Sequence, residues 1–172
     1  AFSTENWKRP KDEVQNIMNI LREYLRDAKN FKDENIKVKF IGNLEPLADD
    51  IKELIKKDEE GSKDATGLNL NIAINYGGRN EILHSVKSIV SDVNNGFIDF
   101  DNIDEETISN YLYTGSIPDP DLLIRTSGEE RISNFLLWQL AYTEFYFDKC
   151  WWPDFSSENL LEAIRVFSKR QR

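Results

Sequence analysis

The sequence is poor in the side chains that most often mark metal and redox centres. Its one cysteine, Cys150, cannot form an internal disulfide, and its one histidine, His84, cannot build a zinc cluster. Long apolar runs are also missing, whereas a membrane-spanning helix needs roughly 20 predominantly apolar residues. The opening stretch, Ala1–Asn6, is polar at once and does not read as a signal peptide. These absences favour a reducing, cytoplasmic setting.

Positive charge is scarce as well. Lysine and arginine number 22 against 31 aspartates and glutamates, which gives a net charge of −9 and a pI of about 4.7. General nucleic-acid binding needs clustered lysine and arginine side chains, so no nucleic-acid partner is expected. Apolar residues make up 40% of the 172 positions and aromatic residues 12%, enough for the core of one ordinary domain and too many for a disordered chain.

Helices and strands are predicted to alternate along the chain. Apolar residues at three- and four-residue steps predict helices, and alternating or short apolar runs predict strands. The expected helices cover 11–31, 47–61, 79–93, 104–113 and 157–170, with a helical turn over 134–139, and the strands cover 36–41, 68–74, 121–125 and 144–147. This order predicts an α/β fold with a mainly parallel sheet. Ligands bind such sheets at the carboxyl ends of strands.

The first polar cluster is Ser3–Pro10, which holds two hydroxyls, a carboxylate, an amide, an indole and a guanidinium. One reading is a capped helix start with an exposed tryptophan, because Ser, Thr and Asn are common caps. The other is an anion pocket in which Arg9 binds phosphate and Trp7 forms an apolar wall. Both readings remain open from residue types alone.

The second polar cluster is Arg125–Asn134, where two arginines flank a loop of small hydroxylic residues. Arginine forks match phosphate oxygens, and a helix beginning at Asn134 would point its N–H groups at the same anion. The alternative is a surface loop with arginine–glutamate pairs. Asn75–Arg79 reads mainly as a tight glycine turn, and Asp49–Glu53 as an acidic, solvated helix start.

Taken together, several segments resemble the signatures of the cis-prenyltransferase family. The resemblance covers essentially the whole chain in the right order, and its motifs are long enough to be specific. The segments that carry it are 1–10, 71–79, 121–129, 131–139, 142–147 and 152–155. The implied reaction adds isopentenyl diphosphate, with cis geometry, to an allylic diphosphate such as farnesyl diphosphate, giving a polyprenyl diphosphate for a cell-wall lipid carrier.

The resemblance also implies roles for particular residues. Asn6 matches a proposed proton acceptor, although a neutral amide is a poor base and fits an orienting role better. Glu144 matches a ligand of Mg²⁺, the implied cofactor. The other matched positions contact substrate: Ser3, Thr4, Glu5, Trp7 and Arg9 in the first cluster, and Arg125, Arg131, Ile132 and Ser133 in the isopentenyl diphosphate pocket.

The family implies a parallel sheet flanked by helices, a hydrophobic tunnel for the prenyl chain, and a homodimer. A peripheral membrane contact through the product is compatible with it. Residues 1–172 are expected to be a single domain that lacks the family's leading His-Met-Asp-Gly-Asn-type motif and its C-terminal Arg-x-Gly-type tail. The chain taken alone is therefore expected to be inactive.

Two other functions stay open beside the enzyme. A non-catalytic accessory subunit of the same fold would be free to lose Asn6, Trp7 and Glu144, and their retention favours the enzyme. A generic phosphate-binding α/β domain would not require Trp7 together with the aromatic run around Glu144.

Overall fold

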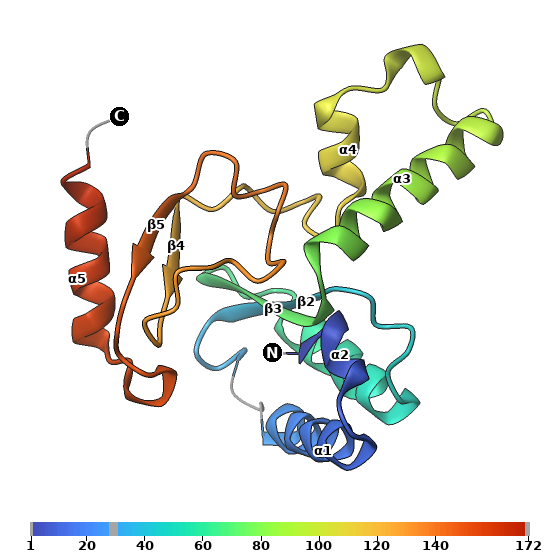
Figure 1. Ribbon diagram of the computed structural model, residues 1–172. Helices are drawn as coiled ribbons and strands as arrows, with labels where there is room; N and C mark the ends of the chain where they lie inside the picture. Colours follow the sequence, from blue (N-terminus) through green and yellow to red (C-terminus); the bar gives the residue numbers. More distant parts are fainter. Residues whose placement is uncertain (1, 28–30, 171–172) are drawn as a thin grey trace. The chain divides into compact units, whose positions relative to one another are not determined.

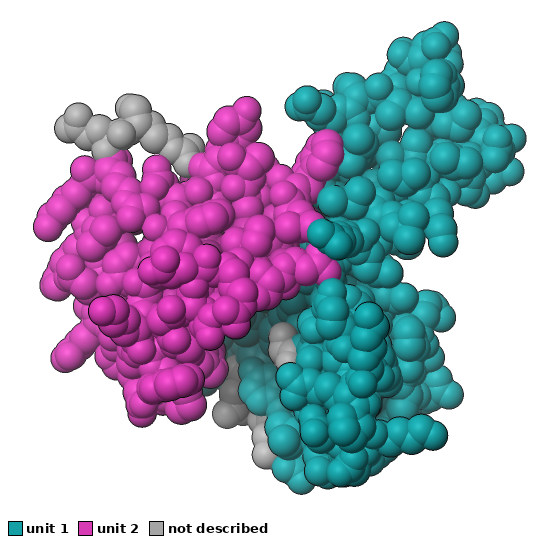
Figure 2. Space-filling view, in the orientation of Figure 1, with its two compact units in different colours: residues 1–114 teal, residues 115–172 magenta. Residues whose placement is uncertain are grey.

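The computed structural model describes residues 2–27 and 31–170. The chain divides into two compact units, Ala1–Thr114 and Gly115–Arg172 (Figure 2). Each unit is described by itself below. The expectation that residues 1–172 form a single domain stays a prediction. Ala1, in the first motif, and residues 28–30, in the expected first helix, lie outside the described residues.

The first unit is built from three parallel strands and the helices between them (Figure 1). Its sheet has the order β1-β3-β2, so β3 is the central strand. The elements in chain order are β1 (Phe2–Ser3), the 3-10 helix η1 (Thr4–Lys8), α1 (Lys11–Asp27), β2 (Ile36–Ile41), α2 (Asp49–Ser62), β3 (Leu68–Tyr76), α3 (Gly78–Asn94), the 3-10 helix η2 (Phe100–Asn102) and α4 (Glu105–Tyr111).

The register of β2 against β3 separates an apolar face from a polar one. Val38 pairs with Leu70 and Phe40 with Ile72, whereas the alternate positions carry Lys or Asn as far as Lys39 and Asn71. Because strand side chains alternate between faces, one side of the sheet is suited to a core. The core cluster joins that face to α1 and α2 through Phe2, Met18, Leu21, Leu25, Val38, Phe40, Leu47, Ile51, Ile55 and Ile74.

Side chains from α2 complete the hydrogen bonding of the edge strand β2. The Val38 N–H donates to Ser62 Oγ at 3.1 Å, and the Phe40 N–H donates to Glu59 Oε1 at 2.8 Å. Edge strands otherwise present unpaired backbone groups to other chains. The helix that covers the apolar face therefore also closes part of the open edge.

The α3–α4 pair follows the carboxyl end of β3. Ser85 of α3 donates its hydroxyl proton to the Ile108 carbonyl of α4 at 3.2 Å. Asp104 caps α4, because its Oδ1 accepts from the Thr107 N–H at 2.7 Å, and this confirms the predicted cap. His84 lies on α3 and stacks on Tyr113, with ring centroids 4.9 Å apart, so it has a packing role.

The second unit holds a two-stranded parallel sheet with one longer helix beside it (Figure 1). Leu122 pairs with Glu144 and Arg125 with Phe147, which sets the register of the two strands. The α5 helix begins after Ser156, whose side chain bonds that of Asn159 at 2.7 Å. The elements are β4 (Leu122–Arg125), β5 (Glu144–Phe147), the 3-10 helix η3 (Trp152–Asp154) and α5 (Ser157–Ser168).

The predicted α/β class with parallel strands is confirmed, and each predicted strand is present. The predicted helical turn over 134–139 is wrong at its start, although the Leu140 N–H donates to the Leu136 carbonyl at 3.0 Å and closes one turn. Ser133, Asn134 and Leu136 have φ values of 48°, 61° and 47°, in the left-handed region, which a right-handed helix excludes. The first helix ends at Asp27 in the described residues, and Phe31 already lies in a turn. No described helix has the length and apolar character needed to cross a membrane.

Candidate active site

The segment Ser3–Arg9 leaves the carboxyl end of β1 as a single 3-10 turn. Asn6 fixes its start, because Asn6 Oδ1 accepts from the Ser3 N–H at 2.8 Å and from Ser3 Oγ at 3.1 Å. Both the capped-start reading and a position at a strand's carboxyl end therefore hold for the same residues. An amide whose oxygen already accepts two bonds is suited to orienting neighbours rather than removing a proton.

Trp7 is held at two points of its ring. Its Nε1 donates to Asn75 Oδ1 at 2.7 Å, and its ring lies edge-on to the buried Phe2 ring at 5.1 Å between centroids. The residue remains 40% exposed, so part of the indole is open to solvent. Such a ring offers a fixed apolar surface beside the polar groups of η1, as the anion-pocket reading requires.

The other residues of this segment differ in exposure. Thr4 and Glu5 lie in η1, Thr4 partly buried and Glu5 exposed. Arg9 is exposed and pairs with Glu13 one turn into α1, with Arg9 Nη1 and Glu13 Oε2 3.6 Å apart. Exposed pairs of this kind contribute little to stability, so Arg9 can turn to a bound anion at small cost.

Backbone hydrogen bonds tie the loop after β4 to the segment after β5. The Asp148 N–H donates to the Arg125 carbonyl at 2.8 Å, and the Gly128 N–H donates to the Asp148 carbonyl at 2.8 Å. Ser127 and Gly128 take left-handed backbone angles, with φ of 68° and 66°. The loop that carries the second polar cluster is thereby anchored at the carboxyl end of β4.

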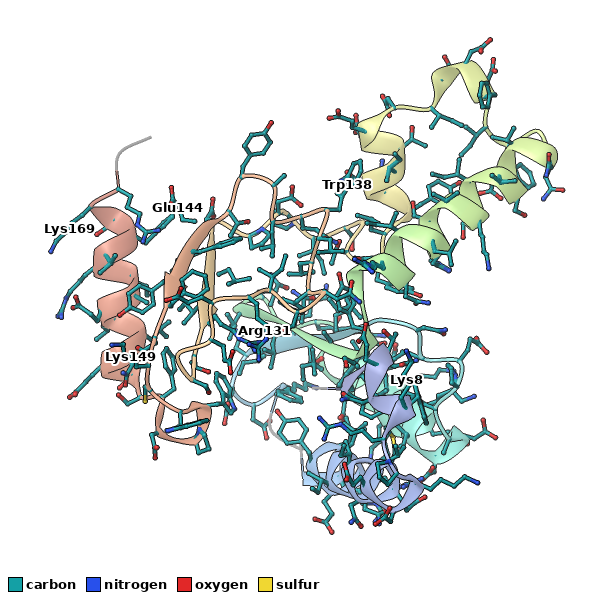
Figure 3. All side chains as sticks on the ribbon, in the orientation of Figure 1. Lys8, Arg131, Trp138, Glu144, Lys149 and Lys169 are labelled. Carbon is teal, nitrogen blue, oxygen red and sulfur yellow. The ribbon has the colours of Figure 1, made fainter. Side chains whose placement is uncertain are left out.

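The two arginines of this cluster differ in their surroundings. Arg125 Nε is buried and has no hydrogen-bond partner among the described residues, a costly state that a bound anion would relieve. Arg131 instead pairs with Glu129 and is 66% exposed. Ile132 is partly buried and Ser133 is exposed, and Figure 3 shows Arg131 on the loop between β4 and β5.

Glu144 begins β5, and its Oε2 accepts from Arg170 Nη1 at 2.7 Å (Figure 3). Over residues 2–27 and 31–170, no group of three or more acidic, histidine or cysteine side chains is arranged to hold a metal. A magnesium role for Glu144 therefore stays a prediction, and it would require Arg170 to release the carboxylate.

A cavity of about 530 Å³ in the first unit contains none of the predicted site residues. Its wall includes Leu25 of α1, the turn residues 31–33, and Leu54, Asp58 and Ser62 of α2. The turn and the end of α2 lead into the amino ends of β2 and β3. The cavity thus lies away from the strand ends that carry Trp7 and Asn75, and the predicted hydrophobic tunnel stays a prediction.

The structure groups the predicted residues by unit. Ser3, Asn6 and Trp7 gather where β1 ends, and Arg125, Arg131 and Ser133 lie on one loop of the second unit. The sequence reading missed the direct bond from Trp7 to Asn75, two residues 68 positions apart. Asn75 directly follows the predicted strand 68–74, and that position at the carboxyl end of a strand was the available signal.

Comparison with known proteins places this arrangement in one family. A family model described as "Putative undecaprenyl diphosphate synthase" matches residues 1–172. An isoprenyl transferase of Clostridium perfringens is 47% identical over 173 residues, covering 100% of this chain and 68% of that protein. A tritrans,polycis-undecaprenyl-diphosphate synthase (geranylgeranyl-diphosphate specific) of Thermoplasma volcanium is 48% identical over 176 residues, with 100% and 68% covered.

Among solved structures, lavandulyl diphosphate synthase from Lavandula x intermedia, in complex with dimethylallyl diphosphate, matches with a TM-score of 0.94. It is 37% identical, and the match covers 100% of this chain and 75% of that one. The fold and these relatives thus define an α/β prenyltransferase. The chain belongs to the undecaprenyl diphosphate synthase family, and the predicted resemblance to cis-prenyltransferases is confirmed.

Proposed function

We propose that this chain elongates an allylic diphosphate with isopentenyl diphosphate and leaves each new double bond cis. The C–O bond of the allylic diphosphate breaks, and its diphosphate departs. The alkene of isopentenyl diphosphate attacks the freed carbon, and loss of a proton restores a double bond. The product is an allylic diphosphate one isoprene unit longer, which is ready for another cycle and serves a cell-wall lipid carrier.

One observation carries this proposal: both polar clusters that the resemblance assigns to diphosphates follow carboxyl ends of parallel strands. Ser3–Arg9 follows β1, and Arg125–Ser133 follows β4. Parallel α/β sheets bind ligands at such ends. The relatives named above are transferases and synthases, which favours an enzyme over an accessory subunit of the same fold.

The residues support separate tasks in this reaction. Arg125 and Arg131 offer planar forks that match diphosphate oxygens, with Ser133 as a hydroxyl donor. Trp7 offers an apolar wall, and Arg9 a second cation near the capped turn. Asn6 orients its neighbours through the hydrogen bonds that its side-chain oxygen accepts from Ser3.

The proposal includes a magnesium ion as cofactor. Among the described residues, Glu144 is the one side chain that we assign to it, so this chain would supply only part of its ligands. Mg²⁺ is commonly held by one or two carboxylates together with substrate phosphates, so Glu144 can supply one ligand beside a diphosphate. Bound there, the ion would neutralise charge on the departing diphosphate. We expect Glu144→Gln to require a higher magnesium concentration for half-maximal activity. Identical magnesium titrations of the parent and this variant would remove Glu144 from the metal site.

The proposed activity is tested by incorporation of labelled isopentenyl diphosphate into an allylic primer. The parent enzyme should form labelled polyprenyl diphosphate, and Arg125→Ala should raise the KM for isopentenyl diphosphate about ten- to hundred-fold. Arg165→Ala, an exposed arginine of α5 that pairs with Glu162, is the matched control and should behave like the parent. Absence of labelled product from the parent would overturn the proposal.

We further propose a homodimer located in the cytoplasm, with membrane contact only through its long product. An exposed apolar stripe on α3 supports the dimer. Leu83, Val86 and Val90 recur at three- and four-residue steps and are each about half exposed. An antiparallel pairing of two α3 helices would bury the apolar stripes of both copies against each other.

A further inference from the structure

Asn75 is the last residue but one of β3, and it has an unusual backbone conformation inside the protein. It is 2% exposed, and its φ of 49° lies in the left-handed region. Asparagine adopts this region more readily than most residues because its short polar side chain bonds locally. The proposed chemistry gives Asn75 no task, yet its conformation is sustained by specific partners.

Both ends of the Asn75 amide are used. Its Oδ1 accepts from Trp7 Nε1 at 2.7 Å, and its Nδ2 donates to the Asn43 carbonyl at 2.7 Å. The Asn43 N–H in turn donates to the Asn75 carbonyl at 3.3 Å. An indole N–H can only donate and a carbonyl can only accept, so one amide orientation alone satisfies both partners.

We propose that Asn75 is a positioning residue that holds the Trp7 ring in place for substrate, an inference that rests on the proposed function. β1 and β3 are paired directly, with Phe2 opposite Ile74, so their carboxyl ends are neighbours. The Phe2 ring contacts the indole at one place and Asn75 holds its N–H at another. The exposed part of the ring therefore meets a substrate in one orientation.

This link has a consequence for the whole η1 turn. Trp7 and Asn6 share that turn, so fixing the indole also limits the movement of the Asn6 amide beside Ser3. A binding group that is held rigidly before substrate arrives loses less entropy on binding. Without the Asn75 side chain, the indole N–H loses its partner and the ring gains freedom.

Two substitutions separate the two bonds of Asn75. Asn75→Gly removes the whole side chain. Because glycine adopts a positive φ without strain, any effect of this variant comes from loss of the side chain. Asn75→Asp keeps an acceptor for Trp7 Nε1 but loses the donor to the Asn43 carbonyl. Asn69→Asp, an exposed amide on the same strand, is the matched control and should behave like the parent.

The first readout is the indole N–H resonance of Trp7 in a nitrogen-15 correlation spectrum without substrate. Trp7→Phe identifies the signal by removing it from the four tryptophan signals. Asn75→Gly should shift this signal toward the position of a solvent-exposed indole and speed its exchange with water. Asn75→Asp should leave it close to the parent. An unmoved signal in Asn75→Gly would overturn the proposal.

The second readout is kcat/KM in a double-mutant cycle. Asn75→Gly should lower kcat/KM about ten-fold in the parent, the size expected for one buried hydrogen bond, and much less in the Trp7→Phe background. Equal losses in both backgrounds would show that Asn75 acts on catalysis by a route other than Trp7 and would overturn the proposal.

The two readouts distinguish failure of this inference from failure of the proposed function. If the parent incorporates no isopentenyl diphosphate, the proposed function falls, whereas the indole resonance still reports whether Asn75 holds Trp7. If the parent is active and the resonance responds but the cycle shows no coupling, the positioning role alone is overturned.

Discussion

At the scale of single residues, the site side chains differ in how much of their bonding capacity the folded chain already uses. The side-chain oxygen of Asn6 accepts two hydrogen bonds, and the indole N–H of Trp7 donates one. Arg131 is paired with Glu129, whereas Arg125 Nε has no partner among the described residues. Asn6 and Trp7 are therefore fixed by bonds within the fold. Arg131 would have to leave Glu129 to bind an anion, whereas Arg125 Nε could donate to an anion without giving up a partner.

Arg131 should contribute to isopentenyl diphosphate binding even though it must leave Glu129. Arg131→Ala is expected to raise the KM for this substrate about ten- to hundred-fold, as for loss of a charge-assisted contact. Arg131→Lys should restore part of the loss, because an ammonium group cannot reproduce the guanidinium fork. Steady-state kinetics measure this. An unchanged KM in both Arg131→Ala and Arg125→Ala would contradict the assignment of this pocket.

Asp58 should make stability depend on pH. Burial raises the pKa of its carboxyl above the ordinary value, against a smaller opposing effect of Lys57. A carboxyl with a raised folded-state pKa favours folding below its unfolded-state value of about 3.9, and that contribution is lost as the pH rises through the folded-state value. Asp58→Asn removes the charge and should therefore raise the urea midpoint at pH 7 and change it little near pH 4.

The matched control is Asp33→Asn. Asp33 is an exposed acid that lines the same cavity of the first unit as Asp58. Its effect on the urea midpoint should be about the same at pH 7 and near pH 4. A lower midpoint for Asp58→Asn at pH 7 would mean that the charged carboxylate stabilises the fold, in contradiction of the argument.

At the scale of elements, helices complete hydrogen bonds that neighbouring strands and loops leave open. Ser62 and Glu59 on α2 accept from the backbone of β2. Gly42, just after β2, has a φ of 125°, and a Cβ there would lie 2.1 Å from the Ile74 carbonyl oxygen. The close approach of this turn to β3 therefore requires glycine, and it places Asn43 beside Asn75.

Loss of the Ser62 hydroxyl should destabilise the first unit. Ser62→Ala leaves the buried Val38 N–H without its acceptor, which costs about 1–3 kcal/mol. A loss of that size should lower the urea midpoint without a change in slope. Ser91→Ala, at an exposed position of α3, is the matched control. Equal midpoints for the two variants would show that the edge of β2 needs no cover from α2.

Local patterns were sufficient to predict most elements, because their physical causes are local. The alternation in 36–41 and the periodicity in 79–93 match β2 and α3 closely. The stretch 134–139 carries four consecutive apolar residues, yet left-handed backbone angles at Asn134 and Leu136 prevent a regular helix there. Those angles belong to the loop that returns the chain from β4 to β5, a constraint that a local pattern does not contain.

The candidate site was predictable in its residues but not in its contacts. Ser3–Arg9 and Arg125–Ser133 were identified because their residue types suit diphosphate and because the resemblance assigns them roles. The bond from Trp7 to Asn75 depends on the pairing of β1 with β3, which joins segments far apart in sequence. The Arg170 partner of Glu144 was likewise outside any local pattern.

At the scale of the whole molecule, one family matches the entire chain, although the chain forms two compact units. Each unit contributes one cluster of candidate diphosphate ligands. The reaction as proposed joins two diphosphate substrates, and this agrees with the presence of two such clusters rather than one. One exposed apolar feature of the first unit is the stripe of Leu83, Val86 and Val90 on α3.

The stripe should mediate self-association. Val86→Lys places a charge in its middle and should raise the dimer Kd about ten-fold or more, with little effect on folding because the residue is exposed. Asn94→Lys, also exposed and near the end of α3, is the matched control. Sedimentation equilibrium should give the parent twice the 20.1 kDa of one chain. A parent that stays monomeric at all concentrations would contradict the homodimer.

The most direct test of the central claim is the geometry of the double bonds that the enzyme makes. Isopentenyl diphosphate labelled with carbon-13 is supplied with farnesyl diphosphate and magnesium, and the methyl carbons of the product are examined by NMR. The account predicts that every newly added unit gives the signal of a cis double bond, while those of the primer remain trans. Newly added trans units, or no elongation at all, would contradict it.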